Sequence, residues 1–201
     1  MEKEFLDFKA RGMFFAEVKK NGKVIETIEK HNLIVNTSCK IIAKALGGVG
    51  VTGNTAPVEI GIKKIGLGTY LKSEFDNLVS PPTSSPDKTV LDGTTVYYKN
   101  ICNDDGSPIE DGDNISEVEY DETNSPNDIT FKFYIGKSDF NSGIVDNPTE
   151  IWEFGLVRSD SNNTLFSMLT RLDQGKSLPI EKNEEVEISG YWKIQVRNTS
   201  A

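Results

Sequence analysis

The segment 184–197 alternates apolar and polar residues more regularly than the rest of the chain. Alternation with period two over this length predicts a half-buried strand of an antiparallel sheet. The preceding segments 150–159 and 164–172 predict two further strands, so we expect the fold to be organised around this group. The apolar side holds Val186, Ile188, Gly190, Trp192, Ile194 and Val196, and the polar side holds Glu185, Glu187, Ser189, Lys193 and Gln195.

The rest of the chain adds more short strands with turn signals between them. Asn21-Gly22 tolerates the positive φ angles of a type I′ turn and predicts a hairpin over 12–30. About nine strands with frequent turns indicate a mainly β fold, which we expect to be an antiparallel, jelly-roll-like β-sandwich. We expect one domain over 1–201 with long loops at 69–92 and 103–127, and further strands at 58–68, 94–102, 116–122 and 129–136.

One short helix is predicted near residues 36–46. Asn36, Thr37 or Ser38 offers a capping oxygen, and Gly47-Gly48 ends the segment. Between them, an apolar stripe at helical spacing would pack against a sheet. The stripe consists of Cys39, Ile42, Ala43 and Leu46.

Charge and composition exclude some classes of function. The net charge of −9 opposes contact with phosphates, so we expect no direct nucleic-acid binding. No segment resembles a signal peptide or a membrane span, which predicts folding in a cytoplasm. Cys39 and Cys102 do not form a disulfide framework; we expect buried free thiols, although a single bridge stays open.

The acidic segment 103–114 is the best candidate for a metal site in the sequence. Calcium needs six to eight oxygen ligands, but the spacing here is not that of an EF-hand. A solvated loop is the favoured interpretation, and we expect no bound cofactor. The candidate calcium ligands are Asp104, Asp105, Asp111 and Asp113, with Glu110 beside them.

No catalytic arrangement is visible in the sequence. His31 is the only histidine, and nothing around it resembles a nucleophile elbow, so we interpret it as a surface residue. Glycoside hydrolysis needs two carboxylates converging on a sugar. Glu150 and Glu153 lie on opposite sides of one predicted strand, as do Glu184 and Glu187, so neither pair converges. We therefore expect a non-enzymatic protein.

The aromatic residues divide into core and surface candidates. Trp152 and Trp192 fall on the apolar sides of their strands and are predicted to lie in the core. Tyr134 and Tyr191 fall on the polar sides, where an aromatic ring with a hydroxyl suits a contact surface.

Four segments in this order resemble small β-rich structural proteins of the virions of tailed bacteriophages. In that family, an N-L-I-V-N-T-like segment opens a helix, a GLGT-like strand end follows, and a hairpin leads to the closing strand. The resemblance covers about half the chain and leaves residues 70–148 without a counterpart. The segments are HNLIVNTSCKIIAKAL (31–46), KIGLGT (64–69), IWEFGLVRSDSNNTLFSMLTRL (151–172) and the strand YWKIQV (191–196) after Lys176.

The resemblance implies a tail, baseplate, fibre or head-decoration component that acts by packing against its own copies and other virion proteins. Its location would be the virion, assembled in the host cytoplasm. Uncovered strand edges favour homo-oligomers, and we expect the loop at 70–92 to form a partner-contacting arm. The predicted contact residues are Tyr70, Phe75, Pro81, Pro82, Tyr134 and Tyr191.

Two alternatives stay open. A carbohydrate- or receptor-binding module would place Tyr97, Tyr98 or Tyr134 in a shallow groove beside acidic residues. A sugar-cleaving enzyme of the same fold would need two convergent carboxylates in a cleft.

Overall fold

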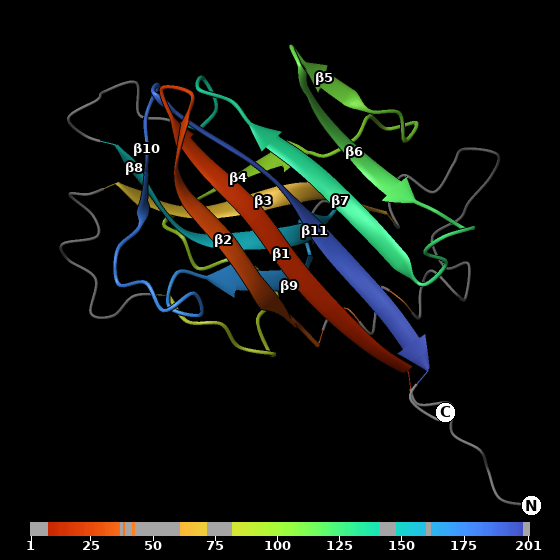
Figure 1. Ribbon diagram of the computed structural model, residues 1–201. Coiled ribbons are helices and arrows are strands. Elements are labelled where there is room, and N and C mark those ends of the chain that lie inside the picture. The colour runs from red at the N-terminus through yellow and green to blue at the C-terminus, as the bar shows by residue number, and fades with distance from the viewer. Residues whose placement is uncertain are drawn as a thin grey trace, which may run out of the picture.

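The protein consists of eleven β-strands in a computed structural model that describes residues 8–36, 38, 42, 61–71, 82–140, 148–159 and 162–198 (Figure 1). The strands are β1 (Phe8–Lys20), β2 (Lys23–Ile34), β3 (Ile62–Leu71), β4 (Thr95–Asn100), β5 (Ile109–Asp111), β6 (Asn114–Tyr120), β7 (Asp128–Ile135), β8 (Thr149–Arg158), β9 (Leu165–Thr170), β10 (Ile180–Lys182) and β11 (Val186–Asn198).

All the strands belong to one antiparallel sheet. Its order is β4-β3-β8-β9-β2-β1-β11-β7-β6-β5, and the short β10 pairs with β8 beside this path. The mainly β, antiparallel prediction is therefore confirmed. A two-sheet sandwich or a jelly roll is not confirmed, because the strands form one continuous path. No helix is among the described elements, and of the predicted helix at 36–46 only residues 36, 38 and 42 are described.

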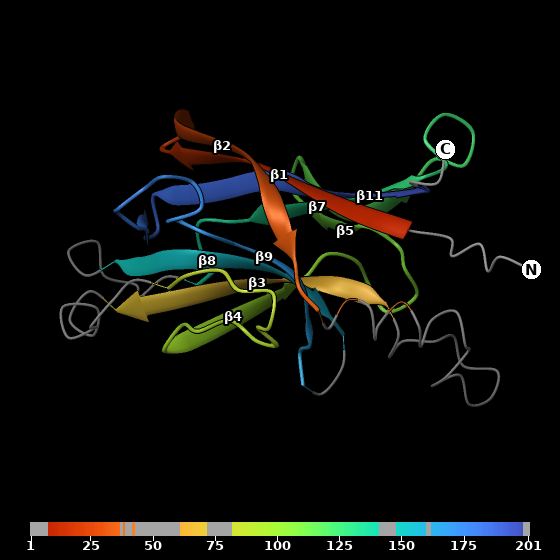
Figure 2. The same cartoon turned by 90° about the horizontal axis from the view of Figure 1, so that it is seen from below.

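The sheet curls into a half-barrel, so that its two halves face each other (Figure 2). Strand β2 connects the halves because it pairs with a different neighbour at each end. Its length from Lys23 to Asn32 pairs with β1, and Leu33 and Ile34 then pair with β9 in the other half. The predicted hairpin turn between β1 and β2 is confirmed, since Asn21 and Gly22 have φ angles of 51° and 76°.

The longest pairing joins β1 to β11 over thirteen residue pairs. Gly190 sits in the middle of β11, between Ala16 of β1 and Phe133 of β7. A side chain at this position would collide with the backbone carbonyl of Phe15, so the close approach of the strands requires a glycine.

The main core lies between the two halves. Phe14 of β1 contacts Trp192 of β11 and Phe154 of β8, with ring centroids 5.0 Å apart in each case. Trp152 and Trp192 are both buried, as predicted from the alternation. Aromatic pairs at this separation stabilise a core beyond their buried area, so Phe14 is a principal contact between the halves.

A second apolar cluster lies on the other face of β3 and β8. It is covered by the strap, which we define as the described segment 82–94. Leu91 of the strap packs over Gly66 and Gly155, two residues paired across β3 and β8 that leave room for its side chain. The cluster consists of Val35, Leu91, Val157, Leu165 and Met168.

The two predicted long loops differ from the prediction. Residues 69–71 belong to β3, residues 72–81 lie outside the described residues, and the strap lies against the sheet. Residues 103–127 contain two strands, β5 and β6, which form a hairpin. The sequence predicts only one short strand here, at 116–122, because the residues of the hairpin are polar and rich in turn formers.

Candidate functional site

In the half of the sheet that holds β1, β11, β7 and β6, the outward face carries a row of side chains from these four neighbouring strands. The register pairs Phe15 of β1 with Tyr191 of β11, Tyr191 with Lys132 of β7, and Lys132 with Glu117 of β6. Residues directly opposite each other on one face of a sheet have touching side chains. The row therefore brings an aromatic pair beside a charged pair.

Phe15 and Tyr191 form the aromatic part of this row. Their ring centroids are 5.3 Å apart with an interplanar angle of 18°, which is a stacked pair. Both side chains are partly exposed, because alternation in β1 and β11 turns their neighbours Phe14 and Trp192 into the core. The pair thus presents apolar ring surface to solvent at the centre of a polar face.

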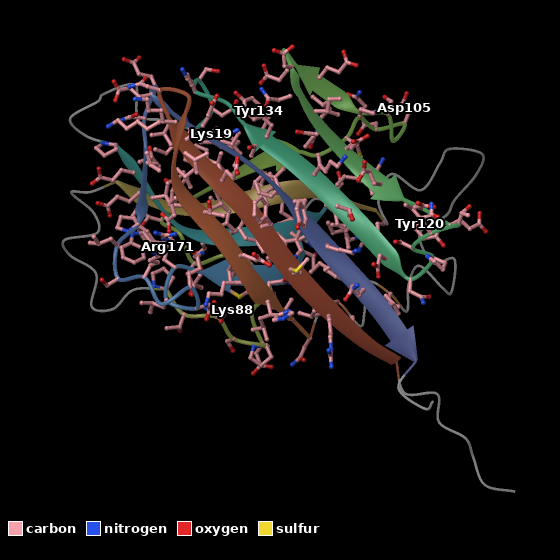
Figure 3. All side chains as sticks on the ribbon, in the orientation of Figure 1. Lys19, Lys88, Asp105, Tyr120, Tyr134 and Arg171 are labelled. Carbon is pink, nitrogen blue, oxygen red and sulfur yellow. The ribbon has the colours of Figure 1, made fainter. Side chains whose placement is uncertain are left out.

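Tyr134 lies one step along β7 from this row (Figure 3). Its hydroxyl donates a hydrogen bond of 2.8 Å to Glu187, and the ammonium of Lys99 lies 5.8 Å from its ring centroid. Burial, followed by the hydrogen bond and charge of Glu187, raises the pKa of Tyr134 to about 12. The hydroxyl therefore stays protonated at neutral pH and acts as a donor.

A shallow groove of about 190 Å³ lies among these residues. Phe15, Tyr134 and Tyr191 give it aromatic walls, while Glu17, Asn114, Lys132 and Ser189 give it donors and acceptors. We call this feature the aromatic groove. Its other lining residues are Ile115, Phe133 and Gly190.

Lys132 carries the positive charge of the aromatic groove. Its ammonium lies 3.0 Å from Glu117 and also contacts Glu119. Hydrogen bonds to Glu119 and then Glu117 raise the pKa of Lys132, so it remains charged. The arrangement suits binding through ring contact and hydrogen bonds. The described lining residues do not include an activated nucleophile with a base beside it.

Of the six predicted contact residues, the structure brings two together: Tyr134 and Tyr191 both line the aromatic groove. Tyr70 is 4% exposed and donates to the carbonyl of Asp92, and Pro82 is also buried, so neither is presented at the surface. Phe75 and Pro81 lie outside the described residues.

The described part of the predicted arm is fixed to the sheet rather than projecting from it. Glu153 of β8 is fully buried beneath the strap and accepts hydrogen bonds from the backbone N–H groups of Asp92 and Gly93, at 2.7 and 2.9 Å. Burial, and next the charge of Asp92, raises the pKa of Glu153 to about 7. The other residue of that candidate pair, Glu150, is buried as well, as is every residue of β8.

The candidate calcium ligands do not converge. Among the described residues, there is no group of three or more His, Cys, Asp or Glu side chains able to hold a metal ion. Asp105 instead accepts hydrogen bonds from the backbone and hydroxyl of Ser107, which lower its pKa. Asp111 lies 3.9 Å from Lys99.

Among the described residues, neither the single histidine nor Cys102 forms part of a reactive centre. His31 is exposed on β2. Cys102 is a buried free thiol whose pKa is raised by burial, as expected, and Cys39 lies outside the described residues. Tyr97 is stacked on Phe140, with ring centroids 5.0 Å apart, so it is not a free platform.

Sequence reasoning missed two features of this region. Phe15 could have been found, because the alternation of GMFFAEVKK turns one of the two adjacent phenylalanines outward. Lys182 could not, because a lysine on a three-residue strand gives no sign of burial. Its side chain is fully buried and donates to the carbonyls of Lys137 and Asn183, and burial lowers its pKa to about 8.

Comparisons with other proteins do not assign the chain to a family. No family model, curated protein or solved structure matches it. Within the described part of the chain, no helix has the length and apolar character that a membrane crossing requires.

Proposed function

We propose that this chain is a non-enzymatic structural protein of a tailed-bacteriophage virion, in the tail, the baseplate or on the capsid. It would act through contacts with its own copies and with other virion proteins. The phage context is supported by the resemblance of the four sequence segments. The contact role is supported by one structural observation, the stacked pair of Phe15 and Tyr191 in the aromatic groove.

Partly exposed aromatic rings favour a contact surface. Tyrosine and phenylalanine are enriched at protein interfaces, where the ring contributes buried area and the hydroxyl a hydrogen bond. Phe15 and Tyr191 are central in the sheet rather than at its rim, since β1 and β11 have neighbours on both sides. A partner lying on this face would therefore bury both rings together with the charged row beside them.

The open ends of the sheet are a second source of contacts. β4 and β5 end the strand order, and each has a neighbour on one side only among the described strands. Unpaired backbone groups at an edge are suited to pairing with another chain. In a symmetric dimer, the same edge or face of both copies would be covered at once.

Sedimentation velocity over a range of protein concentrations tests the contact role. We expect the wild-type protein to self-associate and Phe15→Ser with Tyr191→Ser to shift it toward monomer. Tyr120→Ser is the matched control, because Tyr120 is 59% exposed and does not line the aromatic groove. A protein that stays monomeric throughout, and that binds no other virion component, would contradict the proposal.

A saccharide-binding module is the second candidate, and the aromatic groove favours it specifically. Tyr134 lies in a shallow groove with Glu17 in its lining, and Glu187 accepts a hydrogen bond from the Tyr134 hydroxyl. Aromatic walls with nearby acceptors suit the apolar faces and hydroxyls of a sugar. A glycan array separates the two candidates: binding that is lost in Tyr134→Ala would support the saccharide role, and a blank array would count against it.

A further inference from the structure

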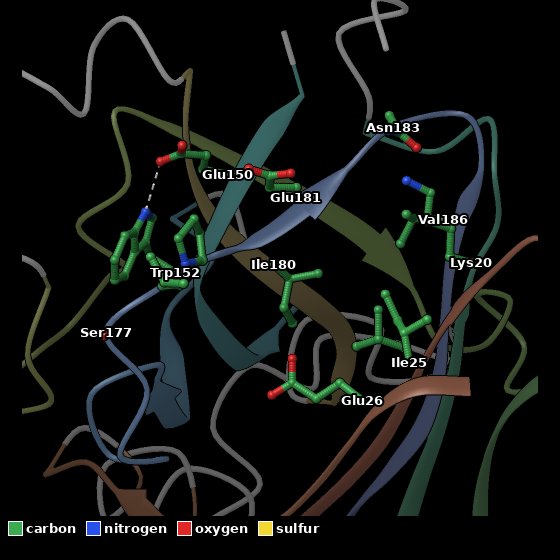
Figure 4. A pocket seen from close by; sticks show the side chains of 13 residues that line it. Lys20, Ile25, Glu26, Glu150, Trp152, Ser177, Ile180, Glu181, Asn183 and Val186 are labelled. Atoms are coloured by element: carbon green, nitrogen blue, oxygen red, sulfur yellow. Dashed lines mark hydrogen bonds between the residues drawn. The ribbon is translucent and has the colours of Figure 1, made fainter. Parts of the chain in front are cut away.

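A second hollow, separate from the aromatic groove, lies beside the β1–β2 turn (Figure 4). Its volume is about 550 Å³, which is within the range of small-ligand sites and large enough for a few side chains. Residues from β1, β2, β8, β10 and the start of β11 line it, together with the segment 177–179. We call it the terminal hollow.

The floor of the terminal hollow is apolar and belongs to the core. Trp152, Ile180, Val186 and Val18 all line it, and each is no more than 4% exposed. Trp152 is held in place by a hydrogen bond of 3.4 Å from its indole N–H to Glu150. An apolar group entering the hollow would therefore meet a fixed aromatic and aliphatic surface.

The exposed lining of the hollow includes two apolar side chains beside its charged ones. Ile25 on β2 is 60% exposed and Leu178 is 72% exposed, and these are the two most exposed large apolar side chains among the described residues. Single exposed apolar residues are common on protein surfaces, whereas two at the rim of one concave site indicate a surface that a binding partner covers.

The charges in the hollow favour a cation. Lys20 is paired with Glu185 at 3.2 Å, so the one basic lining residue is already neutralised. Glu26 is held by Arg171 and lies 3.6 Å from Lys176. Glu181 is exposed and makes no ion pair with a described residue. The net charge of −9 would add to the attraction of a basic group.

The backbone beside the hollow favours a polypeptide over a small amine. β10 carries Ile180 and Glu181, and among the described strands it pairs with β8 on one side only. An extended segment can pair with such an edge while its side chains enter the neighbouring cavity. A small amine would use the charge of Glu181 but would leave the edge and most of the rim uncovered.

We propose that the terminal hollow binds an extended polypeptide segment of a partner that carries a lysine or arginine between apolar residues. The basic group pairs with Glu181, the apolar side chains cover Ile25 and Leu178, and the backbone lies along β10. This inference does not depend on the aromatic groove or on the phage context.

Two capped tripeptides test the proposal on the full-length protein: lysine between two leucines, and glutamate between two leucines. The readout is NMR, because the chain has only two indole N–H groups, those of Trp152 and Trp192. We expect the lysine peptide to shift the Trp152 resonance saturably and leave that of Trp192 in place. The glutamate peptide should bind about tenfold more weakly, since it replaces an attraction to Glu181 with a repulsion.

Three variants sharpen the test. Glu181→Gln should reduce the preference for the lysine peptide to about twofold, because the charge pair is lost. Leu178→Ser should weaken both peptides by a similar factor, whereas Val90→Ser, an exposed apolar residue outside the hollow, should change neither. An unmoved Trp152 resonance, or equal affinity for the two peptides, would overturn the proposal. So would a Trp152 shift on concentrating the protein alone, which would assign the hollow to a second copy.

Discussion

The guanidinium of Arg171 holds the carboxylate of Glu26 through two hydrogen bonds of 3.0 Å, although 145 residues separate the two in sequence. The same guanidinium donates to the carbonyl of Leu178 and to the side chain of Gln174. Arg171 thereby joins the turn after β9 to β2 and fixes the wall of the terminal hollow. Its planar fork of donors suits this task, which a lysine could not perform in the same geometry.

Replacing Arg171 with methionine should strongly destabilise the protein. Arg171 is 3% exposed, and its removal leaves Glu26 and the Leu178 carbonyl without their donor. Breaking a buried pair from one side costs about 3–5 kcal/mol, and the partial exposure of Glu26 places our expectation near the lower figure. Urea unfolding gives the measurement. Lys176→Met is the control and should change the free energy of unfolding by less than about 0.5 kcal/mol, because Lys176 is exposed.

Burial of Glu153 should make the stability fall as the pH rises. The folded-state pKa is raised to about 7 from 4.5, so the stabilisation is complete below about pH 4.5 and is lost as the pH rises through about 7. A shift of this size corresponds to roughly 3 kcal/mol. We therefore expect the free energy of unfolding of Glu153→Gln, relative to that of the wild-type protein, to rise by about that amount between pH 5 and pH 8.

Other groups also titrate in this range, so the comparison must isolate Glu153. Glu110→Gln, an exposed substitution on β5, is the matched control and should follow the wild-type protein at each pH. A difference in stability between Glu153→Gln and the wild-type protein that stays constant with pH would show that folding does not raise the pKa of Glu153.

A methyl group at Gly93 should lift the strap from the sheet. A Cβ at this position would lie 2.7 Å from Cα and 2.8 Å from the carbonyl carbon of Gly68, and backbone atoms cannot turn aside. We expect Gly93→Ala to lose about 1–3 kcal/mol of stability, the usual cost of overpacking. Amide hydrogen exchange should accelerate at Asp92. Gly136→Ala, whose Cβ would have no neighbour closer than 3.4 Å, should leave that exchange rate unchanged.

The thiol of Cys102 should resist alkylation while the protein is folded. Its residue is 3% exposed, and burial raises its pKa, so the reactive thiolate is both scarce and covered. Peptide mapping after treatment with iodoacetamide should find Cys102 modified at least about tenfold more slowly than in denaturant. Equal rates in the two conditions would mean that this part of the core opens readily.

The strands could be predicted from the sequence wherever one face is buried and the other is exposed to solvent. Val186, Ile188 and Ile194 are buried as the alternation indicated, and the turn at Asn21-Gly22 has the expected positive φ angles. β8 departs from this pattern, since all ten of its residues are buried. Its outer face is covered by the strap, and a loop that packs on a sheet has no periodic signal.

The candidate site was predictable only in part. Alternation places Tyr134 and Tyr191 on the outer face, and the structure confirms their position. Their proximity depends on the register between β7 and β11, which also places Glu187 where it accepts the hydrogen bond of the Tyr134 hydroxyl. Register between strands far apart in the chain follows from long-range packing, so a local pattern could not provide it.

The position of β11 also determines when the protein can fold. β11 lies between β1 and β7, so the middle of the sheet stays vacant until residues 186–198 have left the ribosome. Until then, the hairpin of β1 and β2 has one unpaired edge along β1, and this edge can pair with another nascent chain. The pairing of β1 is therefore completed only after β11, the last described strand, has been synthesised.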